Sequence, residues 1–312
     1  MTPLLEARHL TVHYRTPTAT LRALEDVSFT LAESEVLGIV GESGCGKSTL
    51  GRAVLRLTEP TAGEILFQGQ DLRALSGAAL RRARREMQIV FQDPFGALNP
   101  RHRVATLIGE PLTIHGLPNR EQRVAELLDL VGLPPDSGRR YIHEFSGGQR
   151  QRIGIARALA VQPEFLVCDE AVAALDVSIQ AQILNLFMDL REQLDLTYLF
   201  ISHDLGVVEH LSDRVAIMYL GRIVEEASAE EIFSRANHPY TQALLAEVPR
   251  IDTRKRTFTA IKGEIPSPIN PPPGCHFHPR CPHAMPICRE QAPALATVAP
   301  GHRSACHLNT VG

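Results

Sequence analysis

The sequence predicts an α/β fold with a parallel sheet, because short apolar runs alternate with helical patterns. Each apolar run is nearly continuous, as expected of a strand that is buried on both faces. These runs cover residues 35–40, 87–91, 165–168, 198–202 and 215–219. The helical patterns include 149–160 and 121–131, where Val124, Leu127, Leu128 and Val131 fall on one face.

Composition limits the classes of protein to which the chain can belong. With 312 residues, 44% hydrophobic and 21% charged, it can bury a full core and is expected to be globular. The formal net charge of −3 gives no general basic field, so no nucleic acid partner is expected. The N-terminus lacks the apolar segment of a signal peptide, and no stretch approaches the ~18 apolar residues of a membrane span. We therefore expect a cytoplasmic protein.

The strongest local motif follows the apolar run 35–40. Residues 41–48 read Gly-Glu-Ser-Gly-Cys-Gly-Lys-Ser, which matches G-x-x-x-x-G-K-[ST] between a strand and a helix. The glycines let backbone N–H groups face the phosphates of ATP or GTP, while Lys47 reaches the β- and γ-phosphates and Ser48 can bind Mg²⁺. A chance glycine-rich turn is the alternative. The residues assigned to nucleotide binding here are Gly41, Glu42, Ser43, Gly44, Cys45, Gly46, Lys47, Ser48 and Thr49.

A second candidate motif is the apolar run 165–168, which ends in Asp169 and Glu170. The pair suits Asp169 to a water bound to Mg²⁺ and Glu170 to the attacking water of a hydrolysis reaction. A strand that ends in two acids is more often a loop entry or a helix cap. The phosphate-binding motif upstream favours the catalytic interpretation.

The segment 145–152, Phe-Ser-Gly-Gly-Gln-Arg-Gln-Arg, lies shortly before Asp169 and resembles the signature motif of ABC ATPases. A serine and two glycines before a helix form a second anion-binding site at the helix N-terminus. The resemblance implies that this site binds the γ-phosphate held by the opposite subunit, so that ATP joins two subunits. Its residues are Ser146, Gly147, Gly148 and Gln149.

Other motifs of the ABC family occur in the expected order along the chain, and the resemblance spans about residues 5–250. Gln92 stands as the Q-loop, Asp176 ends the D-loop Ala-Leu-Asp, and His203 is the switch histidine. By resemblance, Gln92 contacts Mg²⁺ or the lytic water, and His203 holds the γ-phosphate and orients that water. Tyr14 is the candidate for stacking on adenine. The ordinary alternatives are a loop amide for Gln92, a satisfied histidine for His203 and a half-buried strand aromatic for Tyr14.

Two departures from the common ABC pattern leave the nucleotide contacts in place. Phe145 replaces the usual leucine of the signature, and Ala-Val-Ala at 171–173 replaces Pro-Thr-Ser after the catalytic glutamate. The sequence therefore predicts an active ATPase with catalytic Glu170, His203 and Gln92. The predicted Mg²⁺ ligands are Ser48, Gln92 and Asp169.

A narrower resemblance connects the chain with the ATPases of dipeptide and oligopeptide importers, most closely the second of their two paired ATPases. It rests on motifs at 41–47, 91–94, 98–101, 238–241, 263–268 and 271–275. It implies two transmembrane permease subunits, a second homologous ATPase, an extracytoplasmic solute-binding protein and a peripheral position at the cytoplasmic face of the inner membrane. Peptide is the cargo that the family implies; nickel, glutathione or another small solute is the alternative.

The predicted organisation follows from the motif order and a change in composition. We expect an ABC ATPase domain at 1–249, with an N-terminal antiparallel β subdomain and an inserted helical subdomain at about 99–145. Prolines at 266–273 introduce a C-terminal extension at 250–312. Three other ABC functions are the alternatives, and each needs a feature that this sequence lacks. An ATPase of DNA repair would contain long coiled coils, a ribosome-acting ABC protein would carry two cassettes, and an exporter would usually carry fused membrane helices.

Four cysteines crowd the C-terminal extension, namely Cys275, Cys281, Cys288 and Cys306. In a reducing compartment such a cluster favours metal binding over disulfides. The spacing is wider than in most structural zinc sites. The importer resemblance implies a [4Fe–4S] cluster, zinc with help from nearby histidines is the rival, and four unligated thiols are the plain alternative.

Overall fold

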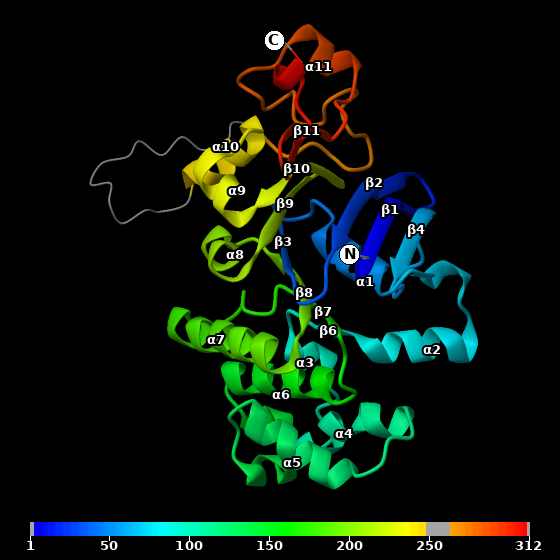
Figure 1. Cartoon of the computed structure of the whole chain (residues 1–312), viewed down its shortest axis with the longest axis vertical. Coiled ribbons are helices and arrows are strands. Elements are labelled where there is room, and N and C mark those ends of the chain that lie inside the picture. Colours follow the sequence, from blue (N-terminus) through cyan, green and yellow to red (C-terminus); the bar gives the residue numbers. More distant parts are fainter. Residues whose placement is uncertain (1–2, 248–262, 311–312) are drawn as a thin grey trace. The chain divides into compact units, whose positions relative to one another are not determined.

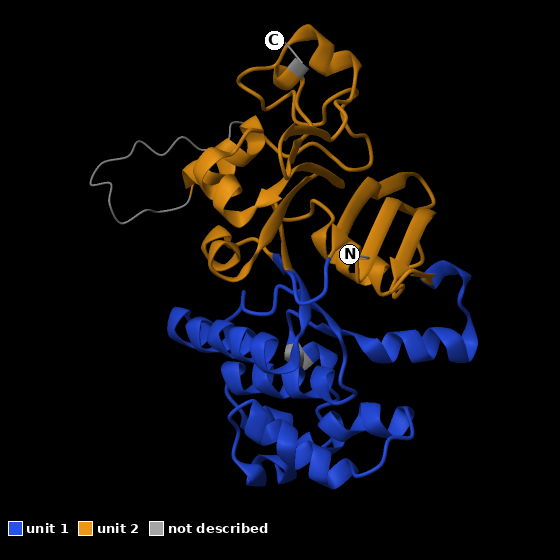
Figure 2. Ribbon diagram, in the orientation of Figure 1, with its two compact units in different colours: residues 1, 32–35, 72–201 blue, residues 2–31, 36–71, 202–312 orange. Residues whose placement is uncertain are grey.

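The computed structural model describes residues 3–247 and 263–310 (Figure 1). The chain forms two compact units (Figure 2). Unit 1 contains residues 1, 32–35 and 72–201, and unit 2 contains residues 2–31, 36–71 and 202–312. The predicted domain boundary near residue 249 lies outside the described residues and stays a prediction. The described part of the C-terminal extension belongs to unit 2, which also contains the phosphate-binding motif.

Unit 1 contains three parallel strands that are surrounded by helices. β6 (Met87–Val90) pairs with β7 (Phe165–Asp169), and β7 pairs with β8 (Thr197–Ser202). Every residue of β7 and β8 is buried, which explains why both read as continuous apolar runs. The strand predictions at 87–91, 165–168 and 198–202 are confirmed to within one residue.

Helices make up most of unit 1 and include the predicted helical region. The predicted helix 121–131 is α5 (Arg120–Leu130), in which Val124, Leu127 and Leu128 are buried. The second predicted helix, 149–160, is α6 (Gly147–Leu159) and begins two residues earlier than predicted. The helices are α2 (Gly77–Glu86), α3 (Pro94–Ala97), α4 (Val104–Ile114), α5 (Arg120–Leu130), α6 (Gly147–Leu159) and α7 (Val177–Leu194), with short 3₁₀ turns η1 (Leu72–Ala74), η2 (Pro135–Arg139) and η3 (Ile142–Glu144).

Unit 2 contains the predicted N-terminal antiparallel sheet. Its strands lie in the order β2-β1-β4-β5. The β1–β2 and β1–β4 pairings are both antiparallel. The strands are β1 (Leu5–Arg15), β2 (Thr20–Leu31), β4 (Ala62–Phe67) and β5 (Gln70–Asp71).

A second group of strands in unit 2 leads to the phosphate-binding motif. β3 (Val36–Val40) pairs in parallel with β9 (Arg214–Tyr219), and β9 pairs antiparallel with β10 (Arg222–Ser228). The helices of unit 2 are α1 (Lys47–Val54), α8 (Leu205–Leu211), α9 (Ala229–Arg235), α10 (Pro239–Glu247) and α11 (Pro286–Glu290), followed by the 3₁₀ turn η4 (His307–Thr310).

The C-terminal extension adds a hairpin that the sequence analysis did not predict. β11 (Ala296–Ala299) pairs with β12 (His302–Ser304), and β12 continues the sheet by pairing with β10. Across that pairing, Glu226 forms an ion pair with Arg303. The proline-rich stretch that precedes the cysteines is neither helix nor strand in its described part, and it contains turns and bends.

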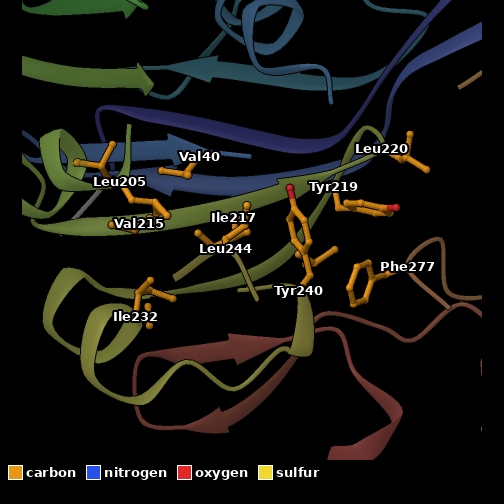
Figure 3. Close-up of a cluster of buried hydrophobic side chains, with 13 residues drawn as sticks. Val40, Leu205, Val215, Ile217, Tyr219, Leu220, Ile232, Tyr240, Leu244 and Phe277 are labelled. Atoms are coloured by element: carbon orange, nitrogen blue, oxygen red, sulfur yellow. The ribbon is translucent and has the colours of Figure 1, made fainter. Parts of the chain in front are cut away.

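The extension also contributes to the hydrophobic core of unit 2 (Figure 3). Phe277 is 1% exposed, and its ring centroid lies 5.3 Å from that of Tyr219 and 5.3 Å from that of Tyr240. The centroids of Tyr219 and Tyr240 are 4.7 Å apart. Burial of three large aromatic side chains stabilises unit 2 and fixes the extension against β9 and α10.

Next to this aromatic cluster lies His238, which is 1% exposed. Its backbone N–H donates to Glu225 Oε2 at 3.0 Å, and its Nδ1 accepts from the backbone N–H of Tyr240 at 3.0 Å. Burial lowers the pKa of His238 to about 4. Protonation of His238 at Nδ1 would remove the acceptor for the N–H of Tyr240 in the first turn of α10.

We predict that His238 makes unit 2 sensitive to acid. An unfolded histidine has a pKa of about 6.5, so between pH 6.5 and 4 the unfolded chain binds a proton that the folded chain excludes. Above pH 6.5 the histidine is neutral in both states and the free energy of unfolding is unaffected. As the pH falls below 6.5, the free energy of unfolding decreases. Between pH 7.5 and 5, the wild type should lose about 2 kcal/mol more unfolding free energy than His238→Asn, whose amide oxygen can still accept from Tyr240.

Chemical denaturation of both proteins at the two pH values measures this difference. Equal losses for wild type and His238→Asn would contradict the assignment.

Candidate nucleotide site

The phosphate-binding loop connects β3 to α1, as predicted, and its glycines are required by the backbone. Gly44 and Gly46 have φ angles of 80° and 106°, in the left-handed region that favours glycine. A Cβ at Gly46 would lie 2.3 Å from the carbonyl oxygen of Ala23, and one at Gly41 would lie 2.2 Å from that of Met218. The surrounding backbone therefore excludes side chains at both Gly41 and Gly46.

Lys47 lies inside this loop and is only 4% exposed. Its Nζ donates to the carbonyl oxygens of Gly41 at 2.7 Å and Glu42 at 3.1 Å. Ser48 and Thr49 are half-buried in the first turn of α1, which contains no acidic residue. A buried ammonium at the positive end of a helix creates a local environment that suits a phosphate group.

One contact to the loop was not predicted from the sequence. The carboxylate of Glu42 accepts from both terminal nitrogens of Arg280, which belongs to the C-terminal extension. No local signal could have revealed it, because the two residues are 238 positions apart.

The two candidate catalytic carboxylates of unit 1 lie at the end of β7. Asp169 is 3% exposed and is the last residue of the strand. Glu170 has a φ angle of 48°, and its N–H donates to the carbonyl oxygen of Ile201 at 3.0 Å. A non-glycine residue in this conformation is strained, and such strain is often found at functional sites.

The unusual segment after Glu170 is explained by packing. Ala171 and Val172, which stand where the common pattern has proline and threonine, are each 2% exposed. Phe145 is 3% exposed, and the guanidinium carbon of Arg140 lies 4.3 Å from its ring centroid. These replacements are accommodated in the core of unit 1.

The signature segment caps α6. Ser146 is the N-cap residue: its Oγ accepts from the backbone N–H of Gln149 at 3.4 Å, and Gln149 Oε1 accepts from the N–H of Ser146 at 3.0 Å. This reciprocal capping box fixes the first turn. Ser146, Gly147 and Gln149 are exposed, whereas Gly148 is buried against α7. The segment is thus ordered and presents an open helix N-terminus.

The remaining predicted residues lie at the ends of elements or on an exposed face. Gln92 is exposed after β6, Asp176 is the exposed N-cap residue of α7, and His203 is exposed immediately after β8. Tyr14, on β1, is 41% exposed, so its ring is accessible.

The predicted residues are divided between the two units. Unit 2 contains Tyr14, the loop 41–49 and His203, and unit 1 contains Gln92, 146–149, Asp169, Glu170 and Asp176. Their nucleotide contacts stay predictions.

Comparison with known proteins identifies the family. The ABC transporter family matches residues 24–173, and the C-terminal region of oligopeptide/dipeptide transporters matches residues 224–288. The oligopeptide transport ATP-binding protein AppF of Bacillus subtilis is 56% identical over 92% of this chain and 90% of its own length. A Brucella ovis protein, named as a peptide import ATP-binding protein, is 55% identical over 98% of both chains.

The chain belongs to the ABC transporter ATP-binding family. It is an ABC ATPase.

Solved structures support the same fold. MJ0796, a bacterial ABC transporter cassette solved as a dimer, is 28% identical with a TM-score of 0.66 over 72% of this chain and 98% of its own. CbiO1 of Clostridium perfringens, part of the transporter complex cbiONQ, is 28% identical with a TM-score of 0.67 over 75% of this chain and 92% of its own. A further MJ0796 dimer contains ADP and phosphate. The predicted fold class and ATPase activity are confirmed.

The oxygen donors of this ABC ATPase suit Mg²⁺. A hydroxyl from Ser48, an amide oxygen from Gln92 and a carboxylate from Asp169 are the hard ligands that this cation prefers. In the described residues no helix is long and apolar enough to cross a membrane.

The four cysteines of the extension are free thiols. Burial, together with smaller contributions from negative charge on Cys288, Cys281 and Cys306, raises the pKa of Cys275 to about 11. The four thiols are therefore close enough to influence one another. However, within residues 3–247 and 263–310 no three histidine, cysteine or acidic side chains are arranged so that they could hold a metal ion.

A matched pair of substitutions tests the packing of the signature segment. A Cβ at Gly148 would lie 2.4 Å from Ile179 Cγ2, whereas one at Gly147 would lie 3.6 Å from its nearest neighbour, Leu175 Cδ2. Since the β-branched Ile179 is stiff in a helix, we predict that Gly148→Ala destabilises unit 1 by about 1–3 kcal/mol. Gly147→Ala should leave the melting temperature within about 1 °C of the wild type. Similar melting temperatures for both variants would contradict this packing.

Proposed function

We propose that this ABC ATPase powers the import of di- and oligopeptides through two separate membrane permease subunits. The observation that carries the proposal is the match of residues 224–288 to the C-terminal region of oligopeptide/dipeptide transporters, together with high identity to AppF over most of the chain. In this function the chain binds at the cytoplasmic face of the inner membrane. A solute-binding protein outside the cytoplasm delivers the cargo.

The proposed assembly pairs this chain with a second, homologous ATPase. The dimeric cassettes of MJ0796 are a precedent for such pairing. Exposed residues support it, because Ser146, Gly147 and Gln149 leave the N-terminus of α6 open to an anion. Val177, beside Asp176 in the predicted D-loop, is 84% exposed, which suits an apolar side chain that becomes covered by a partner.

In the proposed hydrolysis step, Lys47 neutralises the β- and γ-phosphates and the backbone N–H groups of the loop bind their oxygens. Glu170 accepts a proton from the attacking water, and His203 orients that water and the γ-phosphate. Mg²⁺, held by Ser48, Gln92 and Asp169, would supply additional charge stabilisation. The helix N-terminus at Ser146 contributes to the site of the partner ATPase.

Stimulation by cargo tests the transport function. The chain is copurified with the permeases encoded beside it, reconstituted in lipid, and assayed for ATP hydrolysis with the matching binding protein and a panel of peptides. Stimulation by peptides supports the proposal. Stimulation by nickel or glutathione alone would replace the cargo but keep the importer, and the absence of any copurifying permease would contradict the importer itself.

We predict that Glu170→Gln abolishes ATP turnover and traps an ATP-bound dimer. The substitution keeps every proposed phosphate contact but removes the carboxylate that accepts the proton, so turnover should fall at least ~100-fold. Steady-state hydrolysis and size-exclusion chromatography with ATP measure the two effects.

Glu164→Gln is the matched control for this experiment. Glu164 is exposed and lies immediately before β7, whereas Glu170 follows the other end of the strand. The control should retain wild-type turnover. Unchanged turnover in Glu170→Gln would refute its role as the catalytic base.

We also propose that Cys275, Cys281, Cys288 and Cys306 bind a [4Fe–4S] cluster. Support comes from the chemistry of the donors: four free thiols from one small region are the usual ligands of such a cluster. Burial raises the pKa of Cys275, Cys281 and Cys306, so binding must release their protons. Among the described residues no three such side chains are arranged to hold a metal ion, so the proposal requires the thiols to move together when the cluster binds.

We predict that protein purified without oxygen contains about four iron atoms and four acid-labile sulfides per chain. Iron and zinc analysis with visible absorption spectroscopy measures this content. Cys281→Ser should lose most of the iron, whereas Cys168→Ser, in the buried strand β7 of unit 1, should keep it. Stoichiometric zinc without iron would replace the cluster by a zinc site, and absence of both metals would contradict metal binding.

A further inference from the structure

Glu42, the second residue of the phosphate loop, is held through both its side chain and its main chain. Its carboxylate forms two parallel hydrogen bonds with Arg280, Nη1–Oε2 at 2.6 Å and Nη2–Oε1 at 2.9 Å. Its backbone N–H donates to Tyr240 Oη at 3.0 Å. Two residues far along the chain therefore fix one residue of the loop.

Arg280 is itself firmly anchored. Its side chain is 4% exposed, and its backbone N–H donates to the carbonyl oxygen of Phe277 at 2.9 Å. Phe277 is buried against Tyr219 and Tyr240 in the aromatic cluster of unit 2 (Figure 3). The guanidinium Nη1 also lies 3.5 Å from Tyr219 Oη. Arg280 thus approaches the loop from a rigid part of the extension.

The charge of Glu42 explains why such a partner matters. A loop that binds a triphosphate through its backbone is weakened by a nearby uncompensated carboxylate, because like charges repel. Glu42 is 22% exposed at its side chain, so solvent screens its charge only in part. A planar guanidinium neutralises this charge and fixes its position, which a single ammonium would do less well.

We propose that Arg280 is a positioning residue for ATP binding, acting through Glu42 on the phosphate loop. It holds the loop residue in place and cancels the negative charge that would oppose the nucleotide. Since Arg280 directly precedes Cys281, the C-terminal extension acts on the nucleotide site of this same chain. The extension is in this way a part of the ATPase machinery as well as a family-specific addition.

The kinetics of ATP hydrolysis by the full-length chain test this proposal. Arg280→Gln should raise the KM for ATP about three- to tenfold and change kcat by less than about twofold, because the loop is perturbed and the catalytic carboxylate is not. Arg280→Lys keeps the positive charge but cannot form the two parallel hydrogen bonds to the Glu42 carboxylate, so its KM should lie between those of Arg280→Gln and the wild type.

A double-mutant cycle distinguishes this role from general destabilisation. In a Glu42→Gln background, Arg280→Gln should have little further effect on KM, since its partner charge is already absent. Arg303→Gln is the matched control, because Arg303 forms an ion pair between the same extension and Glu226 on β10. That control should leave KM unchanged. If Arg280→Gln fails to fold, the same cycle is run with Arg280→Lys.

An unchanged KM in Arg280→Gln would overturn the proposal. An effect on KM that persists in full without the Glu42 carboxylate would also overturn it, as would an equal rise in KM for Arg303→Gln.

Discussion

A phosphate-binding loop must turn its backbone N–H groups toward an anion, and this constraint determines much of unit 2. The left-handed backbone at Gly44 and Gly46 provides the turn, and the close carbonyl oxygens of Ala23 and Met218 leave no room for side chains at Gly46 and Gly41. Since those oxygens belong to β2 and β9, both groups of strands in unit 2 fix the path of the loop. A short peptide could not maintain this conformation by itself.

The same arrangement explains how charge is managed around the loop. Lys47 is buried but satisfied by two loop carbonyls, so its charge is available without a large desolvation penalty. Glu42 is neutralised by Arg280, whose position depends on the burial of Phe277. In unit 1 the capping box at Ser146 and the strained backbone of Glu170 likewise fix groups before any nucleotide binds. Such preorganisation reduces the free energy that ligand binding must spend on ordering.

The sequence could predict the buried parallel strands because their period is unambiguous. β7 and β8 are buried on both faces and lie within one residue of the predicted runs. The phosphate loop and the signature were predictable because each is a contiguous motif between recognisable elements. The β11–β12 hairpin was missed because both strands are short, β11 is largely exposed, and the buried residues of β12 are polar, so neither strand has an apolar pattern. The pairing of Arg280 with Glu42 was missed because it depends on tertiary structure alone.

The proposed import function bears on what the C-terminal extension has to do. In the proposed function, other subunits recognise the cargo, so this chain need not contact a peptide. Its family-specific features would then act through ATP binding or through protein contacts. The C-terminal extension satisfies the first alternative: β12 pairs with β10, Phe277 enters the core, and Arg280 reaches the phosphate loop. An appendage connected only by a linker could be removed without consequence for hydrolysis. One that neutralises a charge on the nucleotide-binding loop cannot, because the carboxylate it leaves behind would oppose the ligand.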